Sequence, residues 1–574
     1  MRILLFLRKI FFYLLLFFCL EANAHQFYIS PVGNDATGNG SKSSPWKSLS
    51  AACSFVNRPG DTIFVNAGIY NETLTSKLAI GVSLIGEGDN SVITSTTLTA
   101  EWTPVIDMRS DPLANGNQSI SYLKFDGNAL QAAQALWIER RNNVEIHHCT
   151  FIDFRYTGII WVGDGGNAGG DPYDKVTYPD NYVTGSKFFN NIVSNCALNV
   201  PYDWGRGALY IGGHDGMLIY NNTITQTQRA KGFNGYPIKA FANGGFMKGW
   251  KVFNNSITKV DSADGSWLFA IEGAFYEGCE FYGNTITGAI DINFMHKKSY
   301  DYGVYIHDNI LGPEATSTVY YTGVILEFGV EDVIIERNNF RNCAVGIHHT
   351  MRYPEPWVKR VKVCYNKFSN LGSGTYHSAI RFGENENSFF IQEYEIYNNV
   401  FQGNPESKPY FGLHIRGFKS ATDIKIINNI FLNFGWSWFE SNRGNYFTNL
   451  SVENNIFYHN ANKNSATLNV EPVNYIYSGN IIADPKFLSP SDFHLKRSSP
   501  AIGSGSYIPE FSYDIDSIKL SNPPNIGCYE TISDNDHSGV SIKYMLPGIA
   551  IVLLVISGIF MIVRRKTGKK IINI

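Results

Sequence analysis

The chain has 574 residues, a formal net charge of −3 at pH 7 and an aromatic content of 14%. This charge balance argues against a nucleic-acid partner, because proteins that bind nucleic acid carry a strong basic surface. The aromatic content is high, but it suits a stacked core as well as a sugar-binding surface, so composition alone leaves the function open.

Residues 1–24 predict a secretory signal. The chain begins with basic residues, continues with an apolar run at 10–20, and carries the small residues Ala22 and Ala24 before the expected cleavage site. Of the eight cysteines, Cys19 lies in this signal, which leaves an odd number. A long exported chain with an odd cysteine count does not favour a disulfide framework.

Residues 25–100 are expected to form an N-terminal cap and the first coils of a repeat structure. Between Pro45 and Pro59 the apolar residues follow helical spacing at Trp46, Leu49, Ala52, Cys53 and Val56. A short amphipathic helix here would cover the open strand edges of the first coil, which otherwise recruit other chains.

A short phrase recurs through residues 101–482: an asparagine, then any residue, then Ile, Val, Leu or Phe. The repeat asparagines are Asn191, Asn222, Asn255, Asn284, Asn309, Asn339, Asn366, Asn399, Asn429, Asn455 and Asn480. Their spacing of 25 to 33 residues indicates a solenoid. Alternating runs such as 333–336 and 424–427 indicate strands. Asparagine tolerates left-handed backbone and can bond the same residue one coil away, so we expect a stacked asparagine ladder.

These coils resemble the repeats of the pectate-lyase-like superfamily of right-handed parallel β-helices. The segments 27–35, 45–49 and 60–70 resemble the usual opening of secreted bacterial members, and residues 483–532 resemble their closing segment. The resemblance implies an all-β, right-handed parallel β-helix with an N-terminal capping helix. It also implies that a polysaccharide lies in a groove along one stacked sheet, where acidic residues often hold calcium and a Lys or Arg acts on the sugar.

Ionisable residues near strand ends of neighbouring coils are the candidate site. The predicted catalytic residues are Lys239, His296, Lys297 and Arg381; the predicted substrate-binding residues are His348, His349, Arg416 and Glu440; the predicted metal ligands are Glu272, Glu327 and Asp164. Glu272 and Glu327 each precede a repeat asparagine by 12 residues, which predicts the same position two coils apart. For any one of these residues, a solvated ion pair on the outer surface is the alternative.

A glycine-rich insertion at 162–184 contains Asp164 and several further aspartates and tyrosines. Short oxygen-bearing side chains suit calcium or a loop that rims a groove, and a plain glycine-rich turn is equally consistent with them.

The expected function is that of a polysaccharide lyase on acidic glycans. Calcium would neutralise the sugar carboxylate, and a Lys, Arg or His would remove the neighbouring proton. A glycoside hydrolase needs two carboxylates instead, a requirement that Glu272 and Glu327 meet loosely. The other alternative is a non-catalytic glycan-binding or cell-surface structural protein.

The C-terminal residues predict a membrane anchor. After a linker at 533–544, the apolar stretch 545–563 would be about 28 Å long as a helix, close to the thickness of a bilayer core. The basic tail 564–574 follows it, and positive residues favour the cytoplasmic side. The sequence therefore predicts an exported, single-pass protein with residues 25–540 outside the membrane.

Overall fold

The computed structural model describes residues 24–530, apart from 164–178, 180, 202–204, 230, 241–245, 296–301, 351–356, 373–376, 384–388, 407–410, 442–445 and 461–471. Its contacts divide the chain into two units, Met1–Glu530 and Thr531–Ile574. The expected signal peptide lies outside the described residues apart from Ala24. The expected linker, membrane-spanning stretch and basic tail lie wholly outside them. The first unit is described here.

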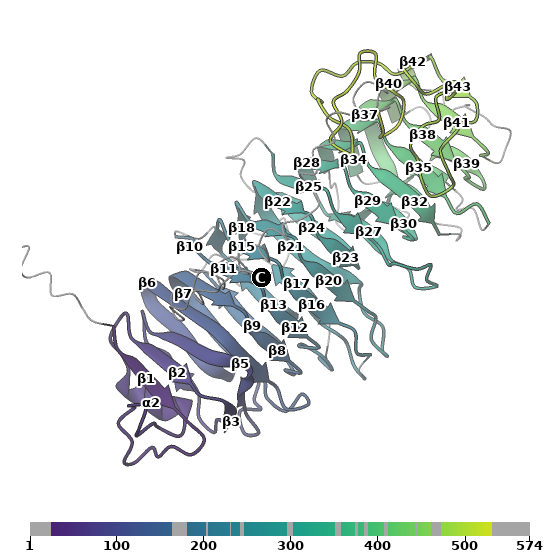
Figure 1. Ribbon diagram of the computed structural model, residues 1–574. Coiled ribbons are helices and arrows are strands. Elements are labelled where there is room, and N and C mark those ends of the chain that lie inside the picture. The colour runs from purple at the N-terminus through teal and green to yellow at the C-terminus, as the bar shows by residue number, and fades with distance from the viewer. Residues whose placement is uncertain are drawn as a thin grey trace, which may run out of the picture. The chain divides into compact units, whose positions relative to one another are not determined.

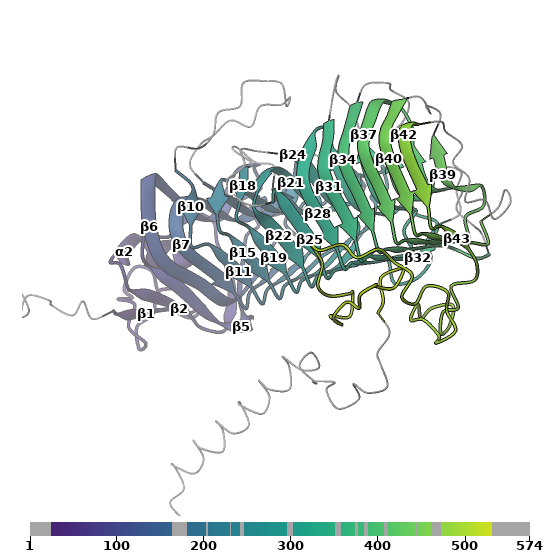
Figure 2. The ribbon, with the colours of Figure 1, turned by 90° about the horizontal axis from the view of Figure 1, so that it is seen from above.

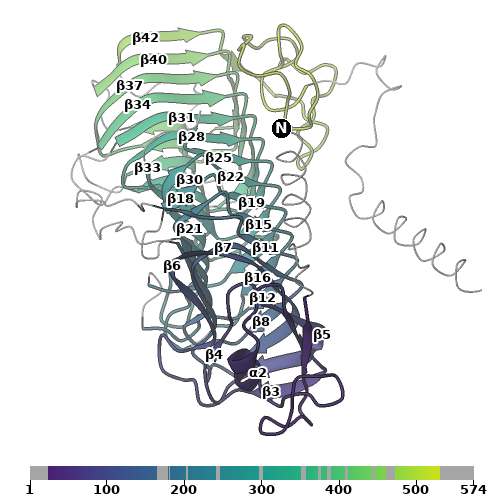
Figure 3. The same cartoon turned by 90° about the vertical axis from the view of Figure 1, so that its left-hand side faces the viewer.

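The described chain winds into a parallel β-solenoid, in which each coil contributes strands to three sheets (Figure 1). Every strand pairing between successive coils is parallel, as the repeat predicted. We name the sheets A, B and C in the order in which the chain visits them within one coil. Figure 3 shows the coils stacked along the solenoid.

Sheet A precedes the asparagine turn of each coil. Its strands are β1 (Gln26–Ile29), β2 (Thr62–Val65), β5 (Ser83–Thr94), β6 (Pro104–Asp126), β7 (Gln134–His147), β11 (Lys187–Phe189), β15 (Leu218–Tyr220), β19 (Lys251–Phe253), β22 (Cys279–Tyr282), β25 (Val304–His307), β28 (Val330–Glu336), β31 (Trp357–Cys364), β34 (Phe389–Tyr397), β37 (Phe418–Ile427), β40 (Phe447–Glu453) and β42 (Val473–Ser478).

Sheet B follows the turn. Its strands are β3 (Gly68–Asn71), β8 (Thr150–Ile152), β12 (Ile192–Ser194), β16 (Thr223–Gln226), β20 (Ser256–Lys259), β23 (Thr285–Thr287), β26 (Ile310–Leu311), β29 (Asn339–Arg341), β32 (Lys367–Leu371), β35 (Val400–Gly403), β38 (Ile430–Leu432), β41 (Ile456–Tyr458) and β43 (Ile481–Ile482). The second half of β5 and the last residues of β6 also pair in this sheet.

Sheet C completes each coil. Its strands are β4 (Ser76–Lys77), β9 (Thr157–Val162), β13 (Gly207–Gly212), β17 (Tyr236–Ala240), β21 (Phe269–Glu277), β24 (Ala289–Met295), β27 (Thr322–Glu327), β30 (Val345–Thr350), β33 (Ser378–Phe382), β36 (Phe411–Ile415) and β39 (Ser437–Ser441). The first halves of β6 and β7 join this sheet. Three short strands lie between sheets C and A: β10 (Val183–Thr184), β14 (His214–Asp215) and β18 (Phe246–Lys248).

The predicted asparagine ladder is present, with one residue corrected. In each ladder step the side-chain amide donates to the Oδ1 atom of the next asparagine, for example from Asn222 to Asn255 at 2.9 Å. In the coil of β29 the ladder residue is Asn338, which bonds Asn366 at 3.0 Å, and not the predicted Asn339. The two asparagines are adjacent in sequence, so only the strand register decides which one turns inward. Asn339 begins β29 instead.

The predicted capping helix is confirmed as α2 (Leu49–Phe55), which starts after the N-cap residue Ser48. Its apolar face is buried on the first coil, together with Trp46 and Val56 on either side of the helix. Glu72 accepts hydrogen bonds from the first helical backbone amide, that of Leu49, at 2.8 Å. An anion at a helix N-terminus is favourable, so this glutamate anchors the cap.

The closing segment after β43 packs on the outside of the later coils (Figure 2). Asn398 donates to the backbone oxygen of Asn525 at 3.0 Å, and the ring of Phe511 contacts Tyr365. This agrees with the position expected of a closing segment, which shields strand edges and turns from solvent.

The expected fold class is corrected in one respect. In the part of the chain that the structure describes, no helix is both long enough and apolar enough to cross a bilayer. The expected transmembrane helix at 545–563 lies outside that part. The fold that the structure describes is therefore an all-β parallel solenoid with one short helix, and it does not support the expected transmembrane helix.

Candidate functional site

One face of sheet C carries a continuous row of side chains that point away from the core. We call it the outer row; its members are Tyr210, Lys239, Glu272, Asp291, Ile325, His348, Arg381, His414 and Glu440, each paired with the next in the strand register. The residue before each member from Lys239 onward belongs to the buried core, so alternation turns the row outward. Eight steps at about 4.8 Å give a row about 38 Å long.

The row brings together five predicted site residues that are far apart in sequence: Lys239, Glu272, His348, Arg381 and Glu440. The sequence placed them in the same half of different coils, and the strand register puts them in a single line. Most of them are nonetheless shielded from solvent.

Lys239 precedes two acidic members of the row, Glu272 and Asp291. Its ammonium group forms an ion pair with the carboxylate of Glu272, and its side chain is 1% exposed. The ammonium nitrogen also lies 5.3 Å from the centre of the Tyr236 ring. The Lys239 ammonium group is therefore held in place by a carboxylate and an aromatic face.

Asp291 follows Glu272 in the row and is fully buried. One carboxyl oxygen accepts a hydrogen bond from the Asn293 amide at 3.0 Å, whereas Oδ1 has no hydrogen-bond partner. Burial raises the pKa of Asp291 well above its usual value, and the nearby carboxylates of Glu327 and Glu272 raise it further. The group is therefore a carboxylic acid that keeps its proton where an exposed aspartate would be ionised.

Glu327 lies beside the row and not in it. Its strand partner in the preceding coil is Asn293, and Thr350 donates a hydrogen bond to its Oε1 atom at 2.9 Å. The prediction that Glu272 and Glu327 share one coil position is therefore wrong by two residues. Counting back from the asparagine failed because the connections between sheets C and A differ in length from coil to coil.

Beyond Ile325 the row carries His348, Arg381 and His414, and it ends with Glu440. Burial and the neighbouring Arg381 lower the pKa of His348 to about 3, and burial with the two arginines 381 and 416 lowers that of His414 to about 3. Both histidines are therefore neutral at pH 7. Arg381 donates to the Tyr320 hydroxyl at 3.1 Å. Nε2 of His348 and both ring nitrogens of His414 have no hydrogen-bond partner.

The two remaining predicted substrate-binding residues divide between the two faces. Arg416 follows β36 and donates to the carboxylate of Glu440 at 3.3 Å at the end of the row. His349 lies inside the solenoid: it is fully buried, its ring stacks on Phe382 at 4.1 Å, and Nε2 lies 3.0 Å from the Tyr394 hydroxyl. His349 therefore packs in the core and does not face a ligand on the outer row.

Three predicted residues lie outside the described part of the chain: His296, Lys297 and Asp164. His296 and Lys297 come directly after β24, the strand that carries Asp291.

The described residues do not fit a calcium site as they lie. No group of three His, Cys, Asp or Glu side chains in the described ranges is placed to hold a metal ion. Glu272, one of the predicted ligands, is paired with Lys239. Asp291, which was not a predicted ligand, lies between the two glutamates and favours its neutral form. Calcium stays a prediction from the sequence and takes no part in the reaction proposed for these residues.

From the sequence, Asp291 belongs to the same half-coil as the candidate residues but received no predicted role, and Asn293 was not singled out. Asp291 lies 18 residues before its ladder asparagine, whereas Glu272 lies 12 before its own, so position in the repeat did not align them. The available signal was the Asp-x-Asn spacing, which puts both side chains on one face of a strand.

A second feature lies on the outer face of sheet A, a recess of about 560 Å³ across the strands β28 to β37. Its charged side chains are largely satisfied within the chain: Arg360 bonds Asp332 at 2.7 Å, and Lys425 bonds Glu395 at 2.9 Å. Because these ion pairs bridge neighbouring coils, we interpret the recess as part of the framework of sheet A.

Comparisons with known proteins bear on the fold. No family model and no curated protein matches the chain. Among solved structures, it is similar to the tailspike protein of E. coli bacteriophage HK620 in complex with a pentasaccharide, with 10% identity, 76% of this chain and 77% of that chain covered, and a TM-score of 0.42.

Two further structures show the same degree of likeness. An alginate lyase from Paenibacillus sp. shares 11% identity over 68% of this chain and 99% of that one, with a TM-score of 0.31. PfbA, a surface adhesin of Streptococcus pneumoniae, shares 12% identity over 74% and 86%, with a TM-score of 0.34. Likeness at this level says nothing about the chemistry of this chain. The stacked coils and the asparagine ladder themselves confirm the parallel β-helix fold that the resemblance to the pectate-lyase-like superfamily implied.

Proposed function

We propose that the protein hydrolyses glycosidic bonds of a polysaccharide that lies along the outer row, with Asp291 as the proton donor. The observation that carries this proposal is the buried carboxyl group of Asp291, which is flanked by two glutamates and whose Oδ1 atom has no hydrogen-bond partner among the described residues; these surroundings raise its pKa well above the usual value. A glycosidase needs such a pair: one carboxyl group that keeps its proton and a second that is ionised.

The second carboxylate is Glu327. Glu327 is the diagonal neighbour of Asp291 across adjacent strands, which puts the Cα atoms of the two residues about 7–8 Å apart. Inverting glycosidases place their carboxyl groups about 6.5–9.5 Å apart to leave room for a water molecule. Glu272 directly adjoins Asp291, but its ion pair with Lys239 weakens it as a nucleophile. We therefore assign the base to Glu327 and expect inversion at the anomeric carbon.

A polymer suits the shape of the row. Successive coils repeat at about 4.8 Å, comparable to the length of one sugar unit, so a linear glycan can meet an equivalent position on each coil. Export, which residues 1–24 predict, would place this face where extracellular glycans are.

The expected lyase reaction has less support among the described residues. It needs a free base, and Lys239 is buried in an ion pair. The hydrolase proposal rests on the raised pKa of Asp291, as a proton donor requires.

The test compares soluble protein on a panel of neutral and acidic polysaccharides, with and without a calcium chelator. Wild-type protein should release reducing ends without forming an unsaturated, ultraviolet-absorbing product. Asp291→Asn and Glu327→Gln should each lower turnover by about 10²- to 10⁴-fold, as expected when a general acid or base is removed. The matched control is Glu145→Gln, which removes a carboxylate on sheet A that pairs with Lys187.

Three results would contradict the proposal. An unsaturated product would establish the lyase, and unchanged turnover in Asp291→Asn would remove the proposed acid. Retention on one immobilised glycan with no turnover on any would favour the non-catalytic glycan-binding protein.

A further inference from the structure

Two adjacent histidines stand on the opposite part of the solenoid surface, at the asparagine turn. His147 ends β7, and His148 follows in left-handed conformation with φ 54°. In the next two coils the same turn position holds Asn190 and Asn221, the residue type that this conformation favours. Histidine also adopts this conformation, so the turn can hold either residue type.

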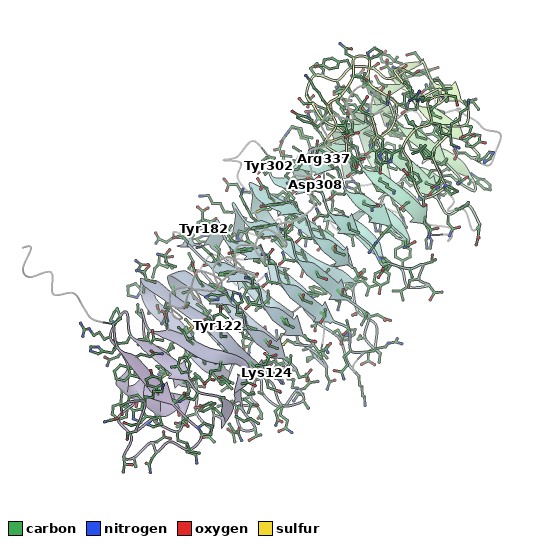
Figure 4. The ribbon with its side chains drawn as sticks, in the orientation of Figure 1. Tyr122, Lys124, Tyr182, Tyr302, Asp308 and Arg337 are labelled. Atoms are coloured by element: carbon green, nitrogen blue, oxygen red, sulfur yellow. The ribbon has the colours of Figure 1, made fainter. Side chains whose placement is uncertain are left out.

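Stacking holds both imidazole rings in place. The His147 ring stacks on Phe189, with centres 4.9 Å apart and planes 19° apart. The His148 ring stacks on Tyr122 at 4.8 Å and 15°, and the two imidazoles are nearly perpendicular, at 88°. Tyr122, labelled in Figure 4, is 44% exposed, so this arrangement is open to solvent.

The two Nδ1 atoms face each other at 2.9 Å. Metal–nitrogen bonds of about 2.05 Å at a right angle put two nitrogens about 2.9 Å apart, whereas a tetrahedral angle puts them about 3.3 Å apart. The separation thus matches two adjacent positions of a square or tetragonal metal ion.

Without metal, one Nδ1–H donates to the other Nδ1. For both Nδ1 atoms to ligate, each ring must carry its proton on Nε2. The Nδ2 atom of Asn190, which can only donate, lies 3.3 Å from Nε2 of His148, so metal binding requires this amide to turn and present its oxygen to Nε2–H.

We propose that Nδ1 of His147 and Nδ1 of His148 form a bidentate site for Cu²⁺ or Ni²⁺, the divalent ions that prefer square or tetragonal nitrogen coordination. In the described ranges no set of three His, Cys, Asp or Glu side chains converges on a metal, so water completes the coordination. The site is independent of the proposed glycan chemistry, because it lies on the face of sheet A.

The test titrates CuCl₂, NiCl₂ and ZnCl₂ separately into untagged full-length protein by calorimetry, with electron paramagnetic resonance of the copper sample. The variant is His148→Asn, which restores the residue that the next coils carry and so preserves the turn. The control is His307→Asn, at the same strand position as His147 five coils further on, where its ring pairs with Asp308 at 2.7 Å.

Wild type and the His307→Asn control should bind one more equivalent of copper than His148→Asn. The copper spectrum should be axial with nitrogen hyperfine structure, and the order of affinity should be copper, then nickel, then zinc. Equal copper binding by wild type and His148→Asn, at equal melting temperature, would overturn the site. Zinc binding tighter than copper binding would overturn the square geometry.

Discussion

At the residue scale, the distinctive group is a single carboxyl whose surroundings keep it neutral. Asp291 is unlike the surface acids of this chain because burial and two neighbouring carboxylates act on it in the same direction, while one amide hydrogen bond opposes them. A group of this kind titrates in the range where enzymes need a proton donor.

The pH dependence of turnover follows from that shift. Activity requires protonated Asp291, so the rate should fall as pH rises through its raised pKa, and should fall at low pH as the partner carboxylate takes up a proton. The check is a profile of kcat/KM against pH. The variant Lys239→Met lacks the cation that lowers the pKa of Asp291, so the fall in rate at alkaline pH should move to higher pH. An alkaline fall at an unchanged pH would show that the pKa of another group determines it.

Adjacent residues of one type mark the limit of sequence prediction at this scale. Asn338 and Asn339, or His348 and His349, cannot be told apart by composition, yet one member of each pair faces the core and the other does not. Register decides, because a shift by one residue exchanges the two faces of a strand. The sequence therefore predicted the ladder and the polar row but misassigned single members.

At the scale of elements, the asparagine ladder ties sheet A to sheet B in every coil from Asn191 onward. Asn309 shows its contribution: its amide donates to the backbone oxygen of Phe281 at 2.8 Å and to Oδ1 of Asn338 at 2.9 Å. It also accepts two bonds from Asn284. These groups are buried and have no water to replace a lost partner.

Asn309→Ala should accordingly destabilise the solenoid by about 2–4 kcal/mol, since it leaves buried backbone and amide groups unsatisfied. The measurement is the urea midpoint of unfolding followed by circular dichroism. Thr285→Ala, an exposed position on β23 in the preceding coil, is the matched control and should change the midpoint little. Equal midpoints for the two variants would mean that the ladder does not stabilise the fold.

At the scale of the molecule, the solenoid ends unequally. The N-terminal end is covered by α2, whereas the last strands β42 and β43 pair with one neighbour each. Tyr475 and Ile482 continue inward-facing rows there, yet they are 57% and 54% exposed. An open, uncharged strand edge favours association.

We therefore expect association that depends on protein concentration and is weakened by Tyr475→Lys. Sedimentation velocity over a range of concentrations measures it. Leu74→Lys, which alters an exposed apolar residue near the capped end, is the control and should leave association unchanged. Sedimentation of the wild-type protein as a single species without concentration dependence would contradict this expectation.

How much was predictable also depends on scale. The repeat predicted the solenoid, α2 and the closing segment, because each rests on a pattern sustained over many residues. The site was less accessible, because it depends on which coils meet, and the connections between them vary in length. Glu272 and Asp291 become neighbours only through the register of β21 with β24.

The asparagine ladder also gives the solenoid an electrical direction. From Asn191 to Asn480 each side-chain oxygen faces the preceding coil and each amide nitrogen faces the following one. Eleven amide dipoles therefore point the same way along the axis, as peptide dipoles do in a helix. Their negative end lies at the coil of Asn191 and their positive end at that of Asn480. The fold thus contains a buried row of aligned dipoles that runs parallel to the outer row of sheet C.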